Sequence, residues 1–318
     1  MRPNILLIHP TIREVGTRIL DEHAEVTLAP DGAEATLIAE ANRTKTDAMI
    51  IRVEAATRPI FEQVPTLKII GMHGVGTDAI DIAAATENGV LVINAPLVNF
   101  RSTAEHTVMM LLAVAKNVFL GDRAVREGEF NQLRNSILPM EVDRRSIFVI
   151  GLGRIGGEVA RKCLHAFNMR VMSYDPAYDA AAMADRGVEW VSMEQGLAEA
   201  DFVTIHVPLK ADTRRMIDAA AFARMKKGAI FLNIARGGLV DQAALVAALR
   251  SGHLAGAGLD VYENEPHVPE RLKALDNVVL TPHIAAASES AQAAQQEVML
   301  GNLRAFFAGE PLVSPVAL

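Results

Sequence analysis

The sequence is poor in several features that would define its class. A single cysteine, Cys163, occurs among 318 residues, which excludes an internal disulfide framework and is compatible with a reducing compartment. Basic residues number 31 against 38 acidic ones, and the net charge of −7 argues against a general nucleic-acid-binding protein. The longest apolar runs, such as residues 107–115, are too short to span a bilayer. We therefore expect a soluble, cytoplasmic protein that has neither nucleic acid nor membrane as a partner.

In its first hundred residues the chain alternates short apolar, β-branched runs with segments of helical spacing or capping. The predicted strands are 4–8, 24–28, 48–52, 67–71 and 90–96. The predicted helices between them are 11–23, 32–43 and 81–89. Strands that are apolar throughout, rather than alternately apolar and polar, indicate a parallel sheet with both faces covered by helices.

A second series of strands begins near residue 146. Its predicted members are 146–150, 170–174, 202–207, 229–234, 256–261 and 278–281. This number of strands, with helices between them, is the one expected for a complete doubly wound dinucleotide-binding fold. One long helix is predicted over 103–128, and a last helix, over 288–309, is long enough to return to the first unit. The predicted fold class is α/β, with two doubly wound parallel sheets, one unit being inserted in the other.

Three glycines follow the strand at 146–150 with the G-x-G-x-x-G spacing of a dinucleotide-binding turn. Gly151 permits a tight turn, Gly153 lets the backbone approach a pyrophosphate, and Gly156 permits close packing of helix on strand. The N-terminus of the helix that follows offers N–H groups and a partial positive charge to the anion. This spacing is weak evidence alone, but its place between a strand and a helix gives it meaning.

Asp175 stands just after the next predicted strand, where an acidic residue hydrogen-bonds the adenosine ribose hydroxyls. A carboxylate in this place repels a 2′-phosphate, so the sequence favours NAD over NADP as the cofactor. Arg154 contacts either a phosphate or only solvent, and we favour phosphate. The predicted cofactor-binding residues of this region are Gly151, Gly153, Arg154, Ile155, Gly156 and Asp175.

Three further polar residues come at or just after the ends of predicted strands, where ligands bind in such sheets. Arg236 follows the strand at 229–234 and is flanked by glycines, and its guanidinium could bind a carboxylate through two parallel hydrogen bonds. Glu265 and His283 form a plausible acid–base pair, because a carboxylate beside an imidazole stabilises the imidazolium and keeps a proton available for a developing alkoxide. The predicted catalytic residues are therefore Arg236, Glu265 and His283.

These motifs closely resemble those of the D-isomer-specific 2-hydroxyacid dehydrogenases. The resemblance covers nearly the whole chain and lies in 71–81, 102–112, 151–156, 206–218, 233–249, 256–266 and 281–285. It implies reversible hydride transfer between nicotinamide C4 and C2 of a small 2-oxo or 2-hydroxy acid. Arg236 would orient the acid, His283 would exchange the proton of the hydroxyl, and Glu265 would hold the imidazole.

The resemblance also implies which parts of the chain bind the substrate and which bind the cofactor. Residues 1–98 with 289–318 would form a flavodoxin-like substrate domain, and 99–288 an inserted Rossmann NAD-binding domain. Further cofactor contacts implied in the second domain are Pro208, Thr213, Ile234, Ala235 and Asp260, the last to the nicotinamide carboxamide.

A glycine-containing loop of the first unit resembles the substrate loop of the family. Successive N–H groups at Gly74, Val75 and Gly76 would form an anion-binding nest, although the glycines could instead serve only a structural turn. Arg52 matches a position that contacts a second anionic group of the substrate, such as phosphate, sulfonate or carboxylate. It could equally be a solvated strand end.

A second function from another class stays open: an NAD-sensing, non-enzymatic corepressor built on the same scaffold would keep the same residues. A formate-type dehydrogenase is disfavoured, because it has a glutamine in place of Glu265. We expect no metal site, since the scattered His, Asp and Glu show no convincing ligand spacing. The family leads us to expect a homodimer formed through the long helix, where His106 would be a structural or interface residue.

Overall fold

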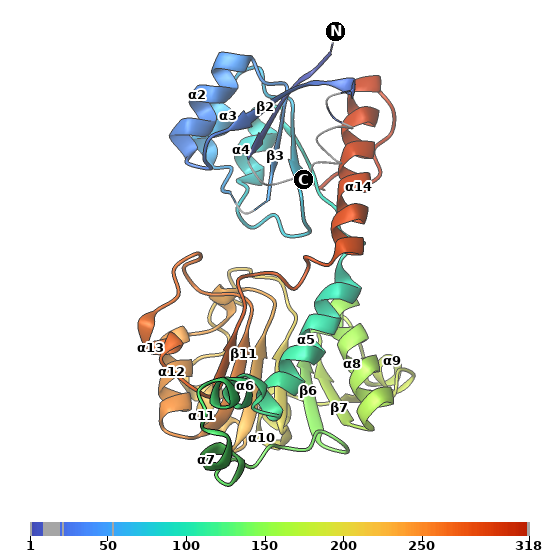
Figure 1. The fold of residues 1–318 in the computed structure, drawn as a ribbon. Coiled ribbons are helices and arrows are strands. Elements are labelled where there is room, and N and C mark those ends of the chain that lie inside the picture. Colours follow the sequence, from blue (N-terminus) through green and yellow to red (C-terminus); the bar gives the residue numbers. More distant parts are fainter. Residues whose placement is uncertain (1, 9–19, 21, 53, 317–318) are drawn as a thin grey trace. The chain divides into compact units, whose positions relative to one another are not determined.

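The computed structural model describes residues 2–8, 20, 22–52 and 54–316. It divides into two compact units, Met1–Asn99 with Ala287–Leu318, and Phe100–Ala286, each of which is described by itself. Both are α/β units built on a parallel sheet, as the apolar strands predict (Figure 1). No helix of the described part of the chain is long and apolar enough to cross a membrane.

The first unit holds a five-stranded parallel sheet in the order β2-β1-β3-β4-β5, which is the flavodoxin-like order. Its strands are β1 (Asn4–Ile8), β2 (Glu25–Ala29), β3 (Ala48–Ile51), β4 (Ile69–Met72) and β5 (Leu91–Ile93). One face packs on α2 (Glu34–Thr44), α3 (Arg58–Gln63) and α4 (Ile82–Glu87), and the other on α14 (Glu289–Ala308). Because both faces are covered, alternate side chains of each strand are buried on opposite sides.

The second unit holds a seven-stranded parallel sheet in the order β12-β11-β10-β9-β6-β7-β8. Its strands are β6 (Ser146–Ile150), β7 (Arg170–Tyr174), β8 (Glu189–Trp190), β9 (Phe202–Ile205), β10 (Ala229–Asn233), β11 (Leu254–Leu259) and β12 (Val278–Leu280). Counted from β6, this is the Rossmann order with one strand added beyond β11. The strand order therefore reverses between β6 and β9, which is where such sheets bind ligands.

Helices cover both faces of the second sheet as well (Figure 1). On one face lie α5 (Phe100–Ala115) and α8 (Arg154–Phe167), and on the other α10 (Met193–Glu199), α11 (Ala219–Arg224) and α12 (Gln242–Arg250). The remaining short helices are α6 (Val118–Arg126), α7 (Phe130–Arg134), α9 (Ala180–Ala184) and α13 (Glu270–Lys273). The helix α5 packs against β10, β11 and β12, and it thus supports the strands whose ends carry the predicted catalytic residues.

The structure corrects several predicted elements. The long helix over 103–128 is wrong: the chain breaks at Asn117, whose left-handed backbone (φ 52°) ends α5 and starts α6 in a new direction. Asparagine adopts this conformation more readily than most residues. The second unit has seven strands where six were predicted, because the two-residue edge strand β8 is too short to show a pattern. The predicted helix at 11–23 lies mostly outside the described residues.

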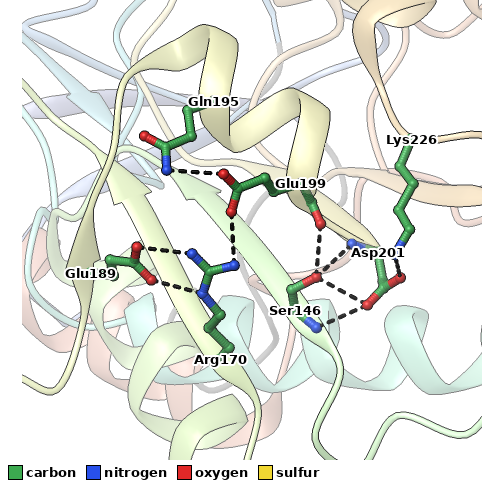
Figure 2. Close-up of polar contacts among 7 residues, drawn as sticks. All are labelled: Ser146, Arg170, Glu189, Gln195, Glu199, Asp201 and Lys226. Atoms are coloured by element: carbon green, nitrogen blue, oxygen red, sulfur yellow. Dashed lines mark hydrogen bonds and ion pairs between the residues drawn. The ribbon is translucent and has the colours of Figure 1, made fainter.

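The amino ends of the second unit's strands are tied together by ion pairs (Figure 2). Arg170, at the start of β7, donates to Glu189 at 2.7 and 2.8 Å and to Glu199 at 2.8 Å. Beside them Ser146, at the start of β6, donates its hydroxyl to Asp201 at 3.0 Å. These contacts fasten the ends of the strands that lie away from the predicted ligand edge, so they concern stability rather than chemistry.

Candidate active site

The predicted functional residues of the second unit follow the carboxyl ends of β6, β7, β9, β10, β11 and β12. Because these strands are parallel, all those ends lie at one edge of the sheet. Residues that are more than a hundred positions apart in the sequence, such as Gly151 and His283, are thereby placed at that edge.

The glycine-rich turn has the geometry of a phosphate cradle. Gly151 has φ +89°, a conformation that glycine adopts without strain. A Cβ on Gly156 would lie 1.9 Å from the carbonyl oxygen of Gly151, so only glycine lets α8 pack this closely on the turn. A Cβ on Gly153, by contrast, would meet no protein atom within 4 Å, although Gly153 precedes the first residue of α8. This open space in front of the N–H groups of a helix fits a pyrophosphate.

Asp175, at the end of β7, is bound to the same turn. Its Oδ2 accepts the N–H of Leu152 at 2.7 Å, and its Oδ1 accepts the N–H of Ala177 at 2.9 Å. Each carboxylate oxygen can accept a second hydrogen bond, so the group keeps capacity for ribose hydroxyls. Asp175 therefore also holds the cradle together, which the sequence did not indicate.

The loop that carries Arg236 is held by its own backbone and by a neighbouring strand end. Buried Asn233 donates from Nδ2 to the carbonyl of Arg236 at 2.8 Å and accepts the N–H of Ala235 at 3.1 Å. A Cβ on Gly237 would lie 1.9 Å from the backbone of Tyr262, so a glycine is needed where the two loops meet. Arg236 Nη1 donates to the carbonyl of Ala235 at 2.8 Å, which directs its guanidinium.

Glu265 and His283 meet as the sequence predicts. His283 Nδ1 donates to Glu265 Oε2 at 2.8 Å, and the N–H of Tyr262 donates to Glu265 Oε1 at 2.9 Å. Burial would raise the pKa of Glu265, but the hydrogen bonds of His283 and Tyr262 and the charges of His283 and Arg236 outweigh it and hold the pKa below its usual value. Glu265 is thus an anion at neutral pH, placed to keep a proton on Nδ1 and to leave Nε2 for a substrate.

The turn that carries His283 is organised by Asp260. His283 has a left-handed backbone (φ 53°), which is uncommon for residues other than glycine, although histidine adopts it more often than most. Buried Asp260 accepts the hydroxyl of Thr281 at 2.5 Å and the N–H groups of Ile284 and Ala285 at 2.9 Å each. The predicted contact of Asp260 with a nicotinamide carboxamide stays a prediction, but its structural role in this turn is plain from these bonds.

Reasoning from the sequence missed several residues that position the predicted trio. Tyr262 donates its hydroxyl to the carbonyl of Thr281 at 2.9 Å, so it links the loops of Glu265 and His283. Asn233 and Thr281 act in the same way on their own turns. A single sequence offers no signal for such residues, because their role lies only in contacts between loops that are far apart along the chain.

The other predicted cofactor residues lie around the same edge. Thr213 donates its hydroxyl to the carbonyl of Pro208 at 2.7 Å and accepts the N–H of Lys210 at 2.8 Å, which closes the loop after β9. Ile234 is buried at the end of β10, while Arg154 is exposed and Ile155 is half-buried at the start of α8. Their contacts with a cofactor remain predictions. Among the described residues, no group of three or more His, Cys, Asp or Glu could hold a metal ion.

In the first unit, the predicted substrate residues follow β3 and β4. The N–H of Gly74 donates to the carbonyl of Met72 at 2.8 Å, so it is used within the turn itself. Asn94 holds the same loop by donating to the carbonyl of Val75 at 2.8 Å. Arg52 is half-buried just after β3, and its backbone N–H donates to the carboxylate of Glu54 at 2.8 Å.

Comparison with known proteins agrees with this geometry. Residues 108–285 match the model of the NAD-binding domain of D-isomer-specific 2-hydroxyacid dehydrogenases. The chain is 39% identical to a glyoxylate reductase of Pyrococcus furiosus over 98% of its own length and 94% of the relative's. It is 40% identical to a D-3-phosphoglycerate dehydrogenase of Archaeoglobus fulgidus over 91% of its length, but spans only 54% of that relative.

The fold of the whole chain is also found among solved structures. The D-mandelate dehydrogenase of Rhodotorula graminis, in its holo form, superposes with a TM-score of 0.88 at 30% identity, over 100% of this chain and 98% of that one. The chain therefore belongs to the family of D-isomer-specific 2-hydroxyacid dehydrogenases. It is an oxidoreductase that acts on CH–OH groups with a nicotinamide cofactor, and none of these comparisons supports the non-enzymatic alternative.

Proposed function

We propose that the enzyme interconverts a small 2-oxo acid and the D-2-hydroxy acid, with Arg236, Glu265 and His283 as its catalytic residues. The observation that carries this proposal is the 2.8 Å hydrogen bond between His283 and Glu265, at the sheet edge that also bears the glycine cradle. When bound, the nicotinamide supplies the hydride for reduction or accepts it in oxidation.

The protein's own residues have separate tasks in this proposal. The Arg236 guanidinium binds the substrate carboxylate and polarises the neighbouring carbonyl. His283, protonated at both nitrogens, donates the Nε2 proton to the carbonyl oxygen as negative charge develops there, and takes it back in oxidation. Glu265 accepts the Nδ1 proton, orients the ring and stabilises the imidazolium by its opposite charge.

We propose NAD as the preferred cofactor. The carboxylate of Asp175 lies beside the cradle, where it would accept ribose hydroxyls and repel a 2′-phosphate. The proposed contacts of the cradle with the cofactor are made by Gly151, Gly153, Arg154, Ile155 and Gly156. Further contacts are proposed for Pro208, Thr213, Ile234, Ala235 and Asp260.

We assign substrate binding in the first unit, predicted as 1–98 with 289–318, to the loop after β4 and to Arg52. Because the N–H of Gly74 already donates to the carbonyl of Met72, the N–H groups of Val75 and Gly76 are the proposed donors to the substrate carboxylate. Arg52 would bind a second anionic group. Purified enzyme assayed with glyoxylate and with a phosphorylated 2-oxo acid tests this assignment, and equal loss or no loss for the two acids in Arg52→Ala would refute it.

We also propose a cytoplasmic homodimer. The helices α5 and α6 expose Met109, Val118, Phe119 and Val125, and α7 exposes Phe130, each at least 39% exposed. Exposed apolar side chains on consecutive helices support an interaction surface in this region. Light scattering after gel filtration should give twice the chain mass, and Phe119→Arg with Val125→Arg should reduce it to one. Fractionation of the producing cells tests the compartment.

His283→Ala is the decisive test of the chemistry. Turnover should fall by about 10²- to 10⁴-fold, because that is the usual contribution of a positioned proton donor. NADH affinity, measured by fluorescence titration, should change little because His283 is not assigned to the cradle. Turnover close to that of the unsubstituted enzyme would remove His283 from the mechanism.

A further inference from the structure

His106, on α5, contacts the polar group that organises the His283 turn. Its Nε2 lies 3.0 Å from Thr281 Oγ1 and 3.6 Å from Asp260 Oδ1, and its side chain is only 13% exposed. Thr281 in turn donates its hydroxyl to Asp260 at 2.5 Å. His106, Thr281 and Asp260 therefore form one connected polar group, which we name the α5 relay, and it joins the helix to the catalytic turn.

The direction of the hydrogen bonds follows from the chemistry of the groups. An ionised carboxylate only accepts, so the one hydroxyl proton of Thr281 points to Asp260. The lone pairs of Thr281 Oγ1 then face His106, which must donate from Nε2. Burial lowers the pKa of His106 and the charge of Asp260 opposes this only in part, so the ring is neutral at pH 7 and carries its proton on Nε2.

The α5 relay connects a packed helix to a turn whose backbone has a left-handed residue. The helix α5 packs against β10, β11 and β12, whereas the turn after β12 holds His283 in a left-handed conformation. Besides Thr281, the carboxylate of Asp260 binds the N–H groups of Ile284 and Ala285, on the far side of His283. The residues on both sides of His283 are thus bound to the same carboxylate, which His106 reaches through Thr281.

We propose that His106 is a positioning residue of the reaction: through Thr281 and Asp260 it holds the 281–285 turn so that the His283 ring stays against Glu265. This inference rests on the proposed role of His283 as the proton donor. Without the relay the turn is free to move by a fraction of an ångström or more, and a displacement of about 1 Å can cost about 10²-fold in rate.

The kinetic test compares variants that keep or remove the donor. At similar volume, His106→Leu removes the hydrogen bond to Thr281, and Thr281→Val removes that bond together with the one to Asp260. His106→Gln and Thr281→Ser retain the polar group. We expect kcat for reduction to fall about 10- to 100-fold in the first pair and to stay within about threefold in the second. Glu105→Gln, at the neighbouring exposed position, is the control for substitution on α5 and should leave kcat unchanged.

The double variant His106→Leu/Thr281→Val tests whether the two residues act as one unit. If they do, its kcat should equal that of Thr281→Val alone rather than the product of two losses. Equal losses for His106→Gln and His106→Leu, independent losses in the double variant, or undiminished kcat in His106→Leu would each overturn the proposal.

A readout without cofactor or substrate separates positioning from general stability. The side-chain ¹⁵N shifts of His283 report its bond to Glu265, in surroundings that also include the charged or titratable groups of Arg236, Asp260 and Tyr262. We expect these shifts to change in His106→Leu and to be restored in His106→Gln. Unchanged shifts in His106→Leu would refute the inference, while normal turnover of His283→Ala would refute the proposed function itself.

Discussion

Replacing Glu265 by glutamine removes the charge and keeps one hydrogen-bond acceptor, so it tests the electrostatic part of the proposed acid–base pair. In the enzyme, Glu265 Oε2 accepts the Nδ1 proton of His283 at 2.8 Å, and the side chains are 33% and 41% exposed. Glutamine can still accept this proton through its carbonyl oxygen, while its NH2 group replaces the acceptor of the Tyr262 N–H, so that second bond is lost. The ring therefore keeps its orientation in Glu265→Gln, but the imidazolium loses its counter-charge.

The magnitude follows from Coulomb's law. Opposite unit charges about 4 Å apart attract by about 4 kcal/mol at an effective dielectric of about 20, and by about 1 kcal/mol in water. Since both groups are partly exposed, screening places the interaction between these limits, at about 1.5–3 kcal/mol. A loss of about 1.4 kcal/mol corresponds to a tenfold lower rate, so a transition state that carries the imidazolium charge should be reached about 10- to 100-fold more slowly without Glu265's charge.

The assay is kcat/KM at neutral pH in both directions. The ring carries positive charge in the transition state of either direction, so kcat/KM should fall by up to about 10- to 100-fold in Glu265→Gln. Glu265→Ala, which removes the acceptor as well, should lower it further. An unchanged kcat/KM in Glu265→Gln would refute the electrostatic role of Glu265.

The remaining predictions concern the cradle and stability. Gly156→Ala should prevent stable folding of the turn, because its Cβ would meet the Gly151 carbonyl. Gly153→Ala should keep Tm nearly unchanged but weaken NADH binding more than about tenfold. Equal losses of Tm for the two variants in thermal scans would contradict this. Asp175→Asn should narrow the preference for NADH over NADPH by about tenfold or more in paired kinetic assays, since a repulsion of about 1.4 kcal/mol is removed, and an unchanged ratio would count against the ribose role. Hydrogen bonds from neighbouring basic side chains lower the pKa of Glu158 from 4.5 to about 2, so its stabilising contribution, about 1 kcal/mol, is present at neutral pH and lost as the pH falls from about 4.5 to about 2. Urea unfolding of Glu158→Gln and the unsubstituted enzyme should therefore converge at low pH, and a constant difference would show that the ion pair contributes nothing.

Much of the fold could be predicted because its signals are local. Continuously apolar strands such as β1 and β3 indicated a parallel sheet covered on both faces, and the glycines after β6 marked a dinucleotide turn in its strand–helix context. The break at Asn117 was missed because the apolar spacing runs on past it, and the edge strand β8 was missed because two residues carry no period. The periodicity of a segment shows which face is buried, but it does not show where the chain changes direction.

The catalytic site could likewise be predicted only in part from the sequence. The residue types and their places after strands determined that Arg236, Glu265 and His283 are candidates, because parallel strands bring their carboxyl ends to one edge. Only the tertiary structure decided that His283 meets Glu265 at 2.8 Å, that Asp260 serves the turn beside it, and that His106 reaches that turn from α5. The reason is physical: a local pattern records which side chains are available at a strand end, whereas hydrogen bonds between loops depend on distances that exist only once helices and sheet have packed.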